Sequence, residues 1–264
     1  MSGDREPSIR MYEIVNRPGL VFLLVGVVLW LVSRLGAEMR HRRPLADDSR
    51  TDFSLLLSAA LTLLALIVGF SFSFVSNRYD QRKALEEAEA NAIGTEYARA
   101  DLMPRADAEK VQGLLKRYVA LRIEFYDELD RGDLKRINRE TALVQGELWK
   151  AVLGPAEARP TPVMSLVVSG MNDVLNSQSY TQAAWWNRMP TSNWAFLIAV
   201  AVCCNFLIGY GLRSVKSEKR LLYIFPVLIT IALTFLADID APRRGLIQIE
   251  PQNLKALADQ LSRG

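Results

Sequence analysis

Two sets of side chains in this sequence place hydroxyl or charged groups at regular spacing. The first set lies in an uncharged apolar segment and shares one face of a predicted helix, because its members recur every three or four residues. Its members are Ser58, Thr62, Ala65, Gly69 and Ser73. Such a face either packs closely against another helix or gives a weakly polar lining to a conduction path in an oligomer. Close packing is favoured, and the second interpretation stays open.

The second set carries charged or amide groups beside the apolar segments. Its members are Glu89, Asn91, Arg99, Asp238, Asp240, Arg243 and Arg244. The last four follow directly on an apolar segment, so an ion-pair cluster at the membrane interface accounts for them. A more specific hypothesis is that these groups anchor the C-terminal segment against the helix that carries Glu89, Asn91 and Arg99, and so form the mouth of a site.

Neither set supports catalysis or cofactor binding. The one histidine, His41, lies in an arginine-rich loop, so neither a serine triad nor a histidine metal cluster can be assembled from this chain. Four carboxylates at Glu86, Glu87, Glu89 and Glu96 are explained by a charged, solvated helix face. No glycine-rich phosphate loop is present. We therefore expect no metal, no cofactor and no enzymatic activity.

Four apolar segments must position these side chains. They span about 18–35, 53–77, 194–212 and 221–238, and each approaches the roughly 20 residues that a hydrocarbon core of about 30 Å requires. The net charge of +3 is small, and basic residues cluster beside these segments, which favours membrane anchoring over nucleic-acid binding. The sequence thus predicts an all-α membrane protein with four transmembrane helices.

The residues between the second and third spans follow a helical pattern without strand alternation. They predict a helical extramembrane domain over 78–190, with helices at about 107–129, 134–153 and 163–183. Arg131–Asp133 and the prolines at 155, 160 and 162 are expected to separate these helices. The N-terminal part, 1–77, holds the first two spans, and 191–240 holds the last two. Residues 241–264 are expected to form a turn and a short helix.

Lysine and arginine near the span ends predict the orientation. The loops 34–52 and 213–220 are short and rich in arginine and lysine, so the positive-inside rule places both loops in the cytoplasm. The termini and the helical domain then lie on the opposite side.

Four stretches of sequence resemble a family of bacterial membrane proteins described as bestrophin-like. They are FVSNRYDQR at 74–82, EANAIGT at 89–95, RADLMP at 99–104 and ADIDAPRRGLI at 237–247. The resemblance covers both halves of the chain and implies the same four-span layout in a bacterial inner membrane.

The family name implies a function by way of the bestrophins. These are pentameric anion channels whose aromatic-lined second span forms a neck, to which Phe70, Phe72 and Phe74 are loosely similar. The resemblance implies a homo-oligomer in a lipid bilayer that passes a small anion, and the charge distribution predicts that no nucleic acid is bound. It also implies a cytoplasmic helical domain, opposite to the charge-based orientation. The alternative is a non-conducting membrane scaffold or sensor whose helical domain binds another protein.

Overall fold

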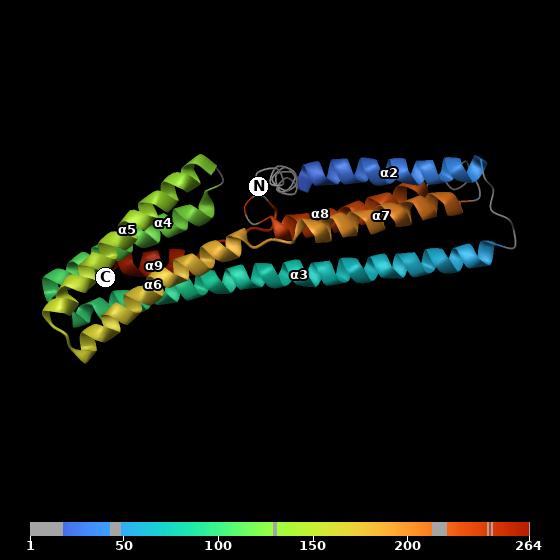
Figure 1. Ribbon diagram of the computed structural model, residues 1–264. Coiled ribbons are helices and arrows are strands. Elements are labelled where there is room, and N and C mark those ends of the chain that lie inside the picture. The colour runs from blue at the N-terminus through green and yellow to red at the C-terminus, as the bar shows by residue number, and fades with distance from the viewer. Residues whose placement is uncertain are drawn as a thin grey trace, which may run out of the picture. The chain divides into compact units, whose positions relative to one another are not determined.

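The computed structural model describes residues 18–42, 49–128, 131–212, 221–241, 243 and 245–263, and these residues are almost entirely helical (Figure 1). The helices are α2 (Pro18–Arg42), α3 (Arg50–Arg99), η1 (Ala100–Leu102), α4 (Arg105–Asp127), α5 (Arg131–Ala158), α6 (Pro162–Trp186), α7 (Thr191–Gly211), α8 (Leu221–Asp240) and α9 (Gln252–Arg263). No strand occurs within the described ranges. The all-α prediction is confirmed.

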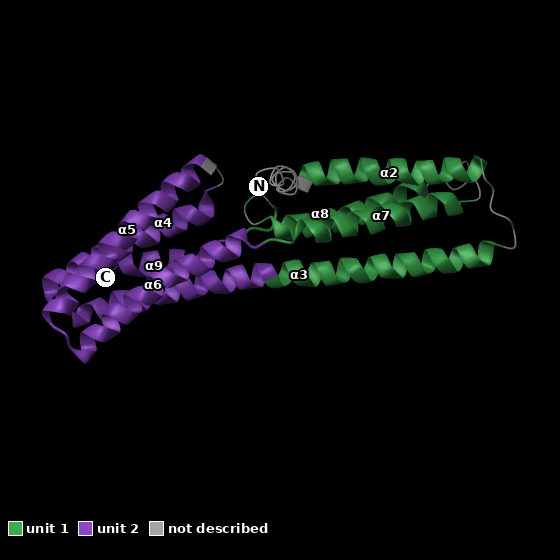
Figure 2. Cartoon of the chain, in the orientation of Figure 1, with its two compact units in different colours: residues 1–77, 188–248 green, residues 78–187, 249–264 purple. Residues whose placement is uncertain are grey.

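The chain forms two compact units (Figure 2). Unit 1 comprises Met1–Asn77 and Arg188–Gln248, and unit 2 comprises Arg78–Asn187 and Ile249–Gly264. Among the described residues, four helical stretches are long and apolar enough to cross a membrane, and they lie at Gly19–Arg42, Arg50–Leu102, Pro162–Gly211 and Leu222–Asp240. Helix α3 contributes to both units, because it continues for 50 residues without a proline.

Unit 1 is built on a close crossing of α2 and α7. A Cβ at Gly36 would overlap the carbonyl oxygen of Phe206, and one at Gly209 would overlap the carbonyl oxygen of Ser33. The Ser33 hydroxyl donates to the carbonyl oxygen of Asn205 at 3.0 Å across this crossing. Small residues let membrane helices approach backbone to backbone, and the hydrogen bond satisfies a hydroxyl away from water.

The membrane part of α3 contacts its neighbours at only a few side chains. Phe72 stacks on Phe235 of α8 with ring centroids 5.9 Å apart, and the thiol of Cys204 lies 3.4 Å from the carbonyl oxygen of Ala60. Only 6% of the apolar stretch of this helix is buried by the rest of the described chain. Most of its surface is therefore free to contact lipid or another copy of the chain.

Unit 2 buries an apolar core between α4, α5, α6, α9 and the last part of α3. Ion pairs between Arg136 and Glu124 and between Arg117 and Glu147 join α4 to the antiparallel α5. Helix α5 extends through Pro155 to Ala158, although the sequence predicted a linker from Pro155. The proline removes one backbone donor within the last turn, a cost that is smaller there than in the middle of a helix.

Candidate functional site

The hydroxyl stripe on α3 faces away from the helices of its own unit. All five residues of the stripe, from Ser58 to Ser73, are exposed. A Cβ at Gly69 would meet no described atom within 4 Å, and the Thr62 hydroxyl donates to the carbonyl oxygen of Ser58 at 2.9 Å. A partner that covers this stripe must therefore come from outside the described residues of the subunit.

A second exposed track of bulky apolar side chains runs beside the stripe. Its members are Leu56, Leu63, Leu66 and Phe70. Phe70 is 68% exposed, whereas Phe72 stacks on α8 and Phe74 is half-buried. The three phenylalanines do not present one common face, and Phe70 is the one that projects most freely. The exposed side of α3 thus offers one track of small and hydroxyl-bearing residues and one of large apolar residues.

The charged residues of α3 beyond Asn77 lie inside unit 2. Arg82, Glu86, Glu89 and Glu96 are all buried, and only Glu87 of the four predicted surface glutamates is exposed. The prediction of a solvated carboxylate face is therefore wrong for three of them. Their spacing keeps them on the helix face that packs into the unit 2 core beside Ala90 and Ile93.

Two of these buried charges hold the ends of other helices. Arg82 donates to the carbonyl oxygens of Ala184 at 3.1 Å and Asn187 at 3.0 Å, at the C-terminal end of α6. Glu86 accepts from the backbone N–H of Leu254 at 2.9 Å and from the Asn253 amide at 2.7 Å, at the N-terminal end of α9. Cations are favoured at helix C-termini and anions at N-termini, so both contacts have the stabilising sign.

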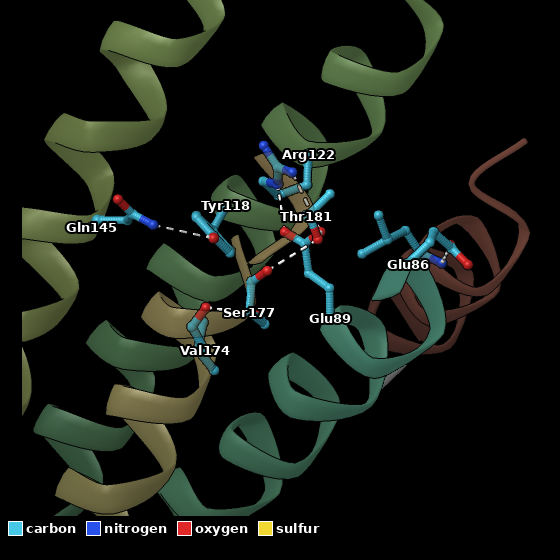
Figure 3. Close-up of polar contacts among 9 residues, drawn as sticks. Glu86, Glu89, Tyr118, Arg122, Gln145, Val174, Ser177 and Thr181 are labelled. Carbon is cyan, nitrogen blue, oxygen red and sulfur yellow. Dashed lines mark hydrogen bonds and ion pairs between the residues drawn. The ribbon is translucent and has the colours of Figure 1, made fainter. Parts of the chain in front are cut away.

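Glu89 forms a buried ion pair with Arg122 of α4 (Figure 3). The guanidinium donates through Nε and Nη2 to both carboxylate oxygens, and the hydroxyl of Thr181 donates to Oε2 at 3.1 Å. Burial alone would lower the pKa of Arg122, but the Glu89 carboxylate raises it above its ordinary value. The Arg122 guanidinium therefore stays charged within the core.

Tyr118 and Phe125 enclose this ion pair. The Gln145 amide of α5 donates to the Tyr118 hydroxyl at 3.4 Å, and the Arg122 guanidinium lies 4.4 Å from the Phe125 ring centroid. Burial, and then the charge of Glu89, raise the pKa of Tyr118, so its hydroxyl stays protonated. Glu89, Tyr118, Arg122 and Phe125 are all buried, and a buried hydrogen-bonded cluster of this kind is typical of a structural network.

The other members of the predicted charged set have separate surroundings or contacts within their own units. Asn91 is exposed, and Arg99 donates to the carbonyl oxygen of Leu166 in α6 at 3.4 Å. Asp238 accepts from the backbone N–H groups of Leu246 at 2.7 Å and Ile247 at 2.9 Å. These two bonds fold the chain back over the end of α8.

Asp240 fixes a second connection in unit 1, because its carboxylate accepts from the backbone N–H of Met189 at 3.0 Å, just before α7. Gly245 lies so close to Asp238 that a Cβ there would overlap its carbonyl oxygen. Arg243 is half-buried, and Arg244 lies outside the described residues. The hypothesis that these groups join Glu89, Asn91 and Arg99 at the mouth of a site stays a prediction.

Sequence reasoning overlooked Arg82 and Arg122. Arg122 occupies an apolar position of α4, where Val111, Leu115, Tyr118 and Phe125 form the buried face. A charged residue at an apolar position of an amphipathic helix indicates a buried partner of opposite charge. That signal was present in the sequence, and Glu89 is the partner.

The arrangement of four apolar helices and a helical unit can be compared with known proteins. A family model described as a bestrophin-like domain matches residues 19–254. The chain belongs to the bestrophin-like family. Among curated proteins, no sequence matches this bestrophin-like chain. The resemblance found in its sequence motifs is confirmed.

Solved structures share the fold of this bestrophin-like chain. A bacterial bestrophin homologue from Klebsiella pneumoniae with a tryptophan-to-alanine mutation matches with a TM-score of 0.64 and 13% identity, over 92% of this chain and 94% of that chain. Another structure of that homologue matches with a TM-score of 0.62 and 15% identity, over 92% and 95%. A membrane protein with a glycine-to-alanine mutation matches with a TM-score of 0.63 and 14% identity, over 92% and 95%. At these identities the matches establish the fold alone.

Proposed function

We propose that this protein is a homo-oligomeric channel of a bacterial inner membrane that passes small anions along a pore lined by α3. The observation that carries the proposal is the exposure of α3, an apolar helix that turns its hydroxyl stripe away from its own subunit. A ring of such helices would give a pore a continuous, weakly polar wall without fixed charge, which suits a weakly hydrated anion better than a compact, strongly hydrated cation.

The extramembrane unit supports assembly from several copies. Helix α4 has nine charged residues among 23, whereas α6 has only Asp173 among 25. The exposed face of α6 instead presents hydroxyl and amide groups, from Ser165, Ser169, Asn172, Asn176 and Ser179. Depletion of charge is a feature of buried interface cores, so a neighbouring copy is the occupant that this face suits.

The two exposed tracks of α3 then take different roles. The stripe with Ser58, Thr62 and Ser73 lines the path, because the hydroxyl groups of Ser58 and Ser73 can donate to a passing anion, and the Thr62 oxygen, whose proton bonds the Ser58 carbonyl, can accept from its water. The apolar track with Leu66 and Phe70 packs against the next copy or narrows the pore. Both roles rest on the oligomer.

The second candidate function is a non-conducting scaffold or sensor whose helical domain binds another protein. Ala65 and Gly69 favour it, because small residues at this spacing let two membrane helices approach closely. In that case the stripe of α3 is dry and lies against a neighbouring helix. Water access to the stripe therefore separates the two functions.

Conductance of the purified protein in planar bilayers tests the channel. Under chloride and sodium gradients we expect currents whose reversal potential follows chloride. Cysteine variants at Ser58, Thr62 and Ser73, made in a Cys203→Ala/Cys204→Ala background, should lose current on reaction with a charged thiol reagent.

Ala60→Cys is the matched control, because its backbone contacts α7 on the opposite side of α3. It should conduct unchanged after the same treatment. A folded oligomer that stays silent, with unreactive cysteines along the stripe, would transfer support to the scaffold.

The lysine and arginine residues near the span ends determine the membrane orientation that we propose. Loops 34–52 and 213–220 lie on the cytoplasmic side by the positive-inside rule, and the helical domain lies on the other side. The analogy with bestrophins supports the reverse orientation.

A further inference from the structure

Glu96 lies near the C-terminal end of α3 and is completely buried. Neither of its carboxyl oxygens has a hydrogen-bond partner among the described residues. This distinguishes it from Glu86 and Glu89, whose oxygens accept hydrogen bonds from α9 and from Arg122. A buried carboxylate without partners is strongly disfavoured, whereas the neutral acid is tolerated.

A glycine on α6 makes room for this carboxyl group. A Cβ at Gly170 would overlap both Oε2 of Glu96 and Nη1 of Arg99. Any other residue at this position would displace the end of the Glu96 side chain. The carboxyl group is thus held in a space bounded by the α6 backbone.

The charged groups around Glu96 offset one another only in part. Arg99, on the same helix, favours the ionised form, and Asp173 of α6 opposes it. From α4, the Lys116 ammonium lies over the Tyr97 ring, 5.8 Å from its centroid. From α9, Leu257 packs at Gly94, and Lys255 is paired with Asp127 of α4. Desolvation is the largest influence and raises the pKa of Glu96 to about 8.

We propose that Glu96 is a proton-binding site that couples pH to the packing of α6 against α3 within unit 2. The protonated acid stays in the space beside Gly170. Loss of the proton places an unpaired negative charge there, and the carboxylate leaves the space for water, which loosens α6 near Gly170. Because this site lies in the extramembrane unit, the inference stands whether or not the protein conducts.

The sign of the pH effect follows from linkage. The folded-state pKa of Glu96 lies above the ordinary value of 4.5, so the folded protein holds this proton more tightly than the unfolded chain. The resulting stabilisation is fully present below about pH 4.5 and is lost as the pH rises through about 8. Stability above that pH should improve when Glu96 is replaced by its neutral isostere.

The test uses the full chain in lipid vesicles and records infrared spectra across pH. In the wild type, the C=O band of a protonated carboxylic acid should persist at neutral pH and disappear with a midpoint near 8. Glu96→Gln should abolish that band, and Glu87→Gln, an exposed residue on the same helix, should leave it unchanged. Persistence of the band and its midpoint in Glu96→Gln would overturn the proposal.

Hydrogen exchange supplies the readout of coupling. After correction for intrinsic rates, the α6 amides around Gly170 should exchange several-fold faster above pH 8 than below it in the wild type, but not in Glu96→Gln. Gly170→Ala should lower the midpoint of the infrared band, because the added methyl displaces the carboxyl group. A wild-type protein whose α6 exchange is independent of pH would also contradict the proposal.

Discussion

At the scale of single residues, the unexpected feature is the row of buried charged side chains that α3 contributes to the interior of unit 2. Arg82, Glu86 and Glu89 each form hydrogen bonds with a different helix, α6, α9 and α4. Their partners lie 102, 168 and 33 residues away along the chain. Each contact costs desolvation, which hydrogen bonds offset only when both partners are present. These charges therefore specify which helices meet.

The Arg122–Glu89 pair makes a prediction at this scale. Arg122→Met leaves Glu89 buried without its counter-charge and should lower the free energy of unfolding by about 3–5 kcal/mol. Thermal unfolding of the purified protein measures the loss. The double variant Arg122→Met/Glu89→Leu should recover much of it, because the unpaired charge is gone.

Arg136→Met is the control for that prediction, because Arg136 forms its ion pair with Glu124 at the surface. Its melting temperature should stay close to that of the wild type, since exposed pairs contribute little. An Arg122→Met variant as stable as Arg136→Met would mean that Glu89 is accommodated without its partner.

At the scale of elements, α9 depends on α3 for its start. The Glu86 carboxylate accepts hydrogen bonds at the N-terminal end of α9, and Leu254 and Leu261 bury the apolar face. A helix of 12 residues is marginal in isolation, so its stability comes from this docking.

Removing the carboxylate should release this helix. Glu86→Ala should destabilise α9 locally by about 1–2 kcal/mol, as loss of a helix cap does. Hydrogen exchange of the α9 amides would then quicken by roughly tenfold, while Glu87→Ala leaves the exchange unchanged. Equal protection of α9 in both variants would show that the apolar face alone holds it.

The elements were largely predictable from the sequence, and the polar interior was not. The spans stand out because an apolar run as long as 53–77 suits the interior of a bilayer better than the core of a water-soluble domain. By contrast, Glu86, Glu89 and Glu96 have the same spacing as a solvated face. Their burial depends on α4, α6 and α9, which arrive from distant parts of the chain. Only Arg122, at an apolar position of its helix, gave a local sign of that interior.

At the scale of the whole molecule, the distribution of lysine and arginine and the analogy with bestrophins predict opposite orientations in the membrane. A cysteine introduced at exposed Ala142 of α5, in the Cys203→Ala/Cys204→Ala background, should react with a membrane-impermeant reagent applied to whole cells whose outer membrane has been permeabilised. The positive-inside rule predicts this reaction because it places the helical domain outside the cytoplasm. A cysteine at exposed Met39, in the last turn of α2, should stay unlabelled until the inner membrane is broken. The reversed pattern would establish the bestrophin-like orientation.

The crossing of α2 and α7 can form only after α7 has been synthesised, long after α2. The Ser33 hydroxyl and its acceptor on Asn205 are 172 residues apart, and Gly36 fits only against the backbone of α7. At a synthesis rate of about 5–20 residues per second, α2 waits on the order of ten to thirty seconds for its partner. During that interval its glycine face must remain in lipid or against the insertion machinery. A variant such as Gly36→Leu would thus be synthesised and inserted normally. Its α2 would fail to pack only once α7 has been made, so the complete chain would then be degraded by quality control.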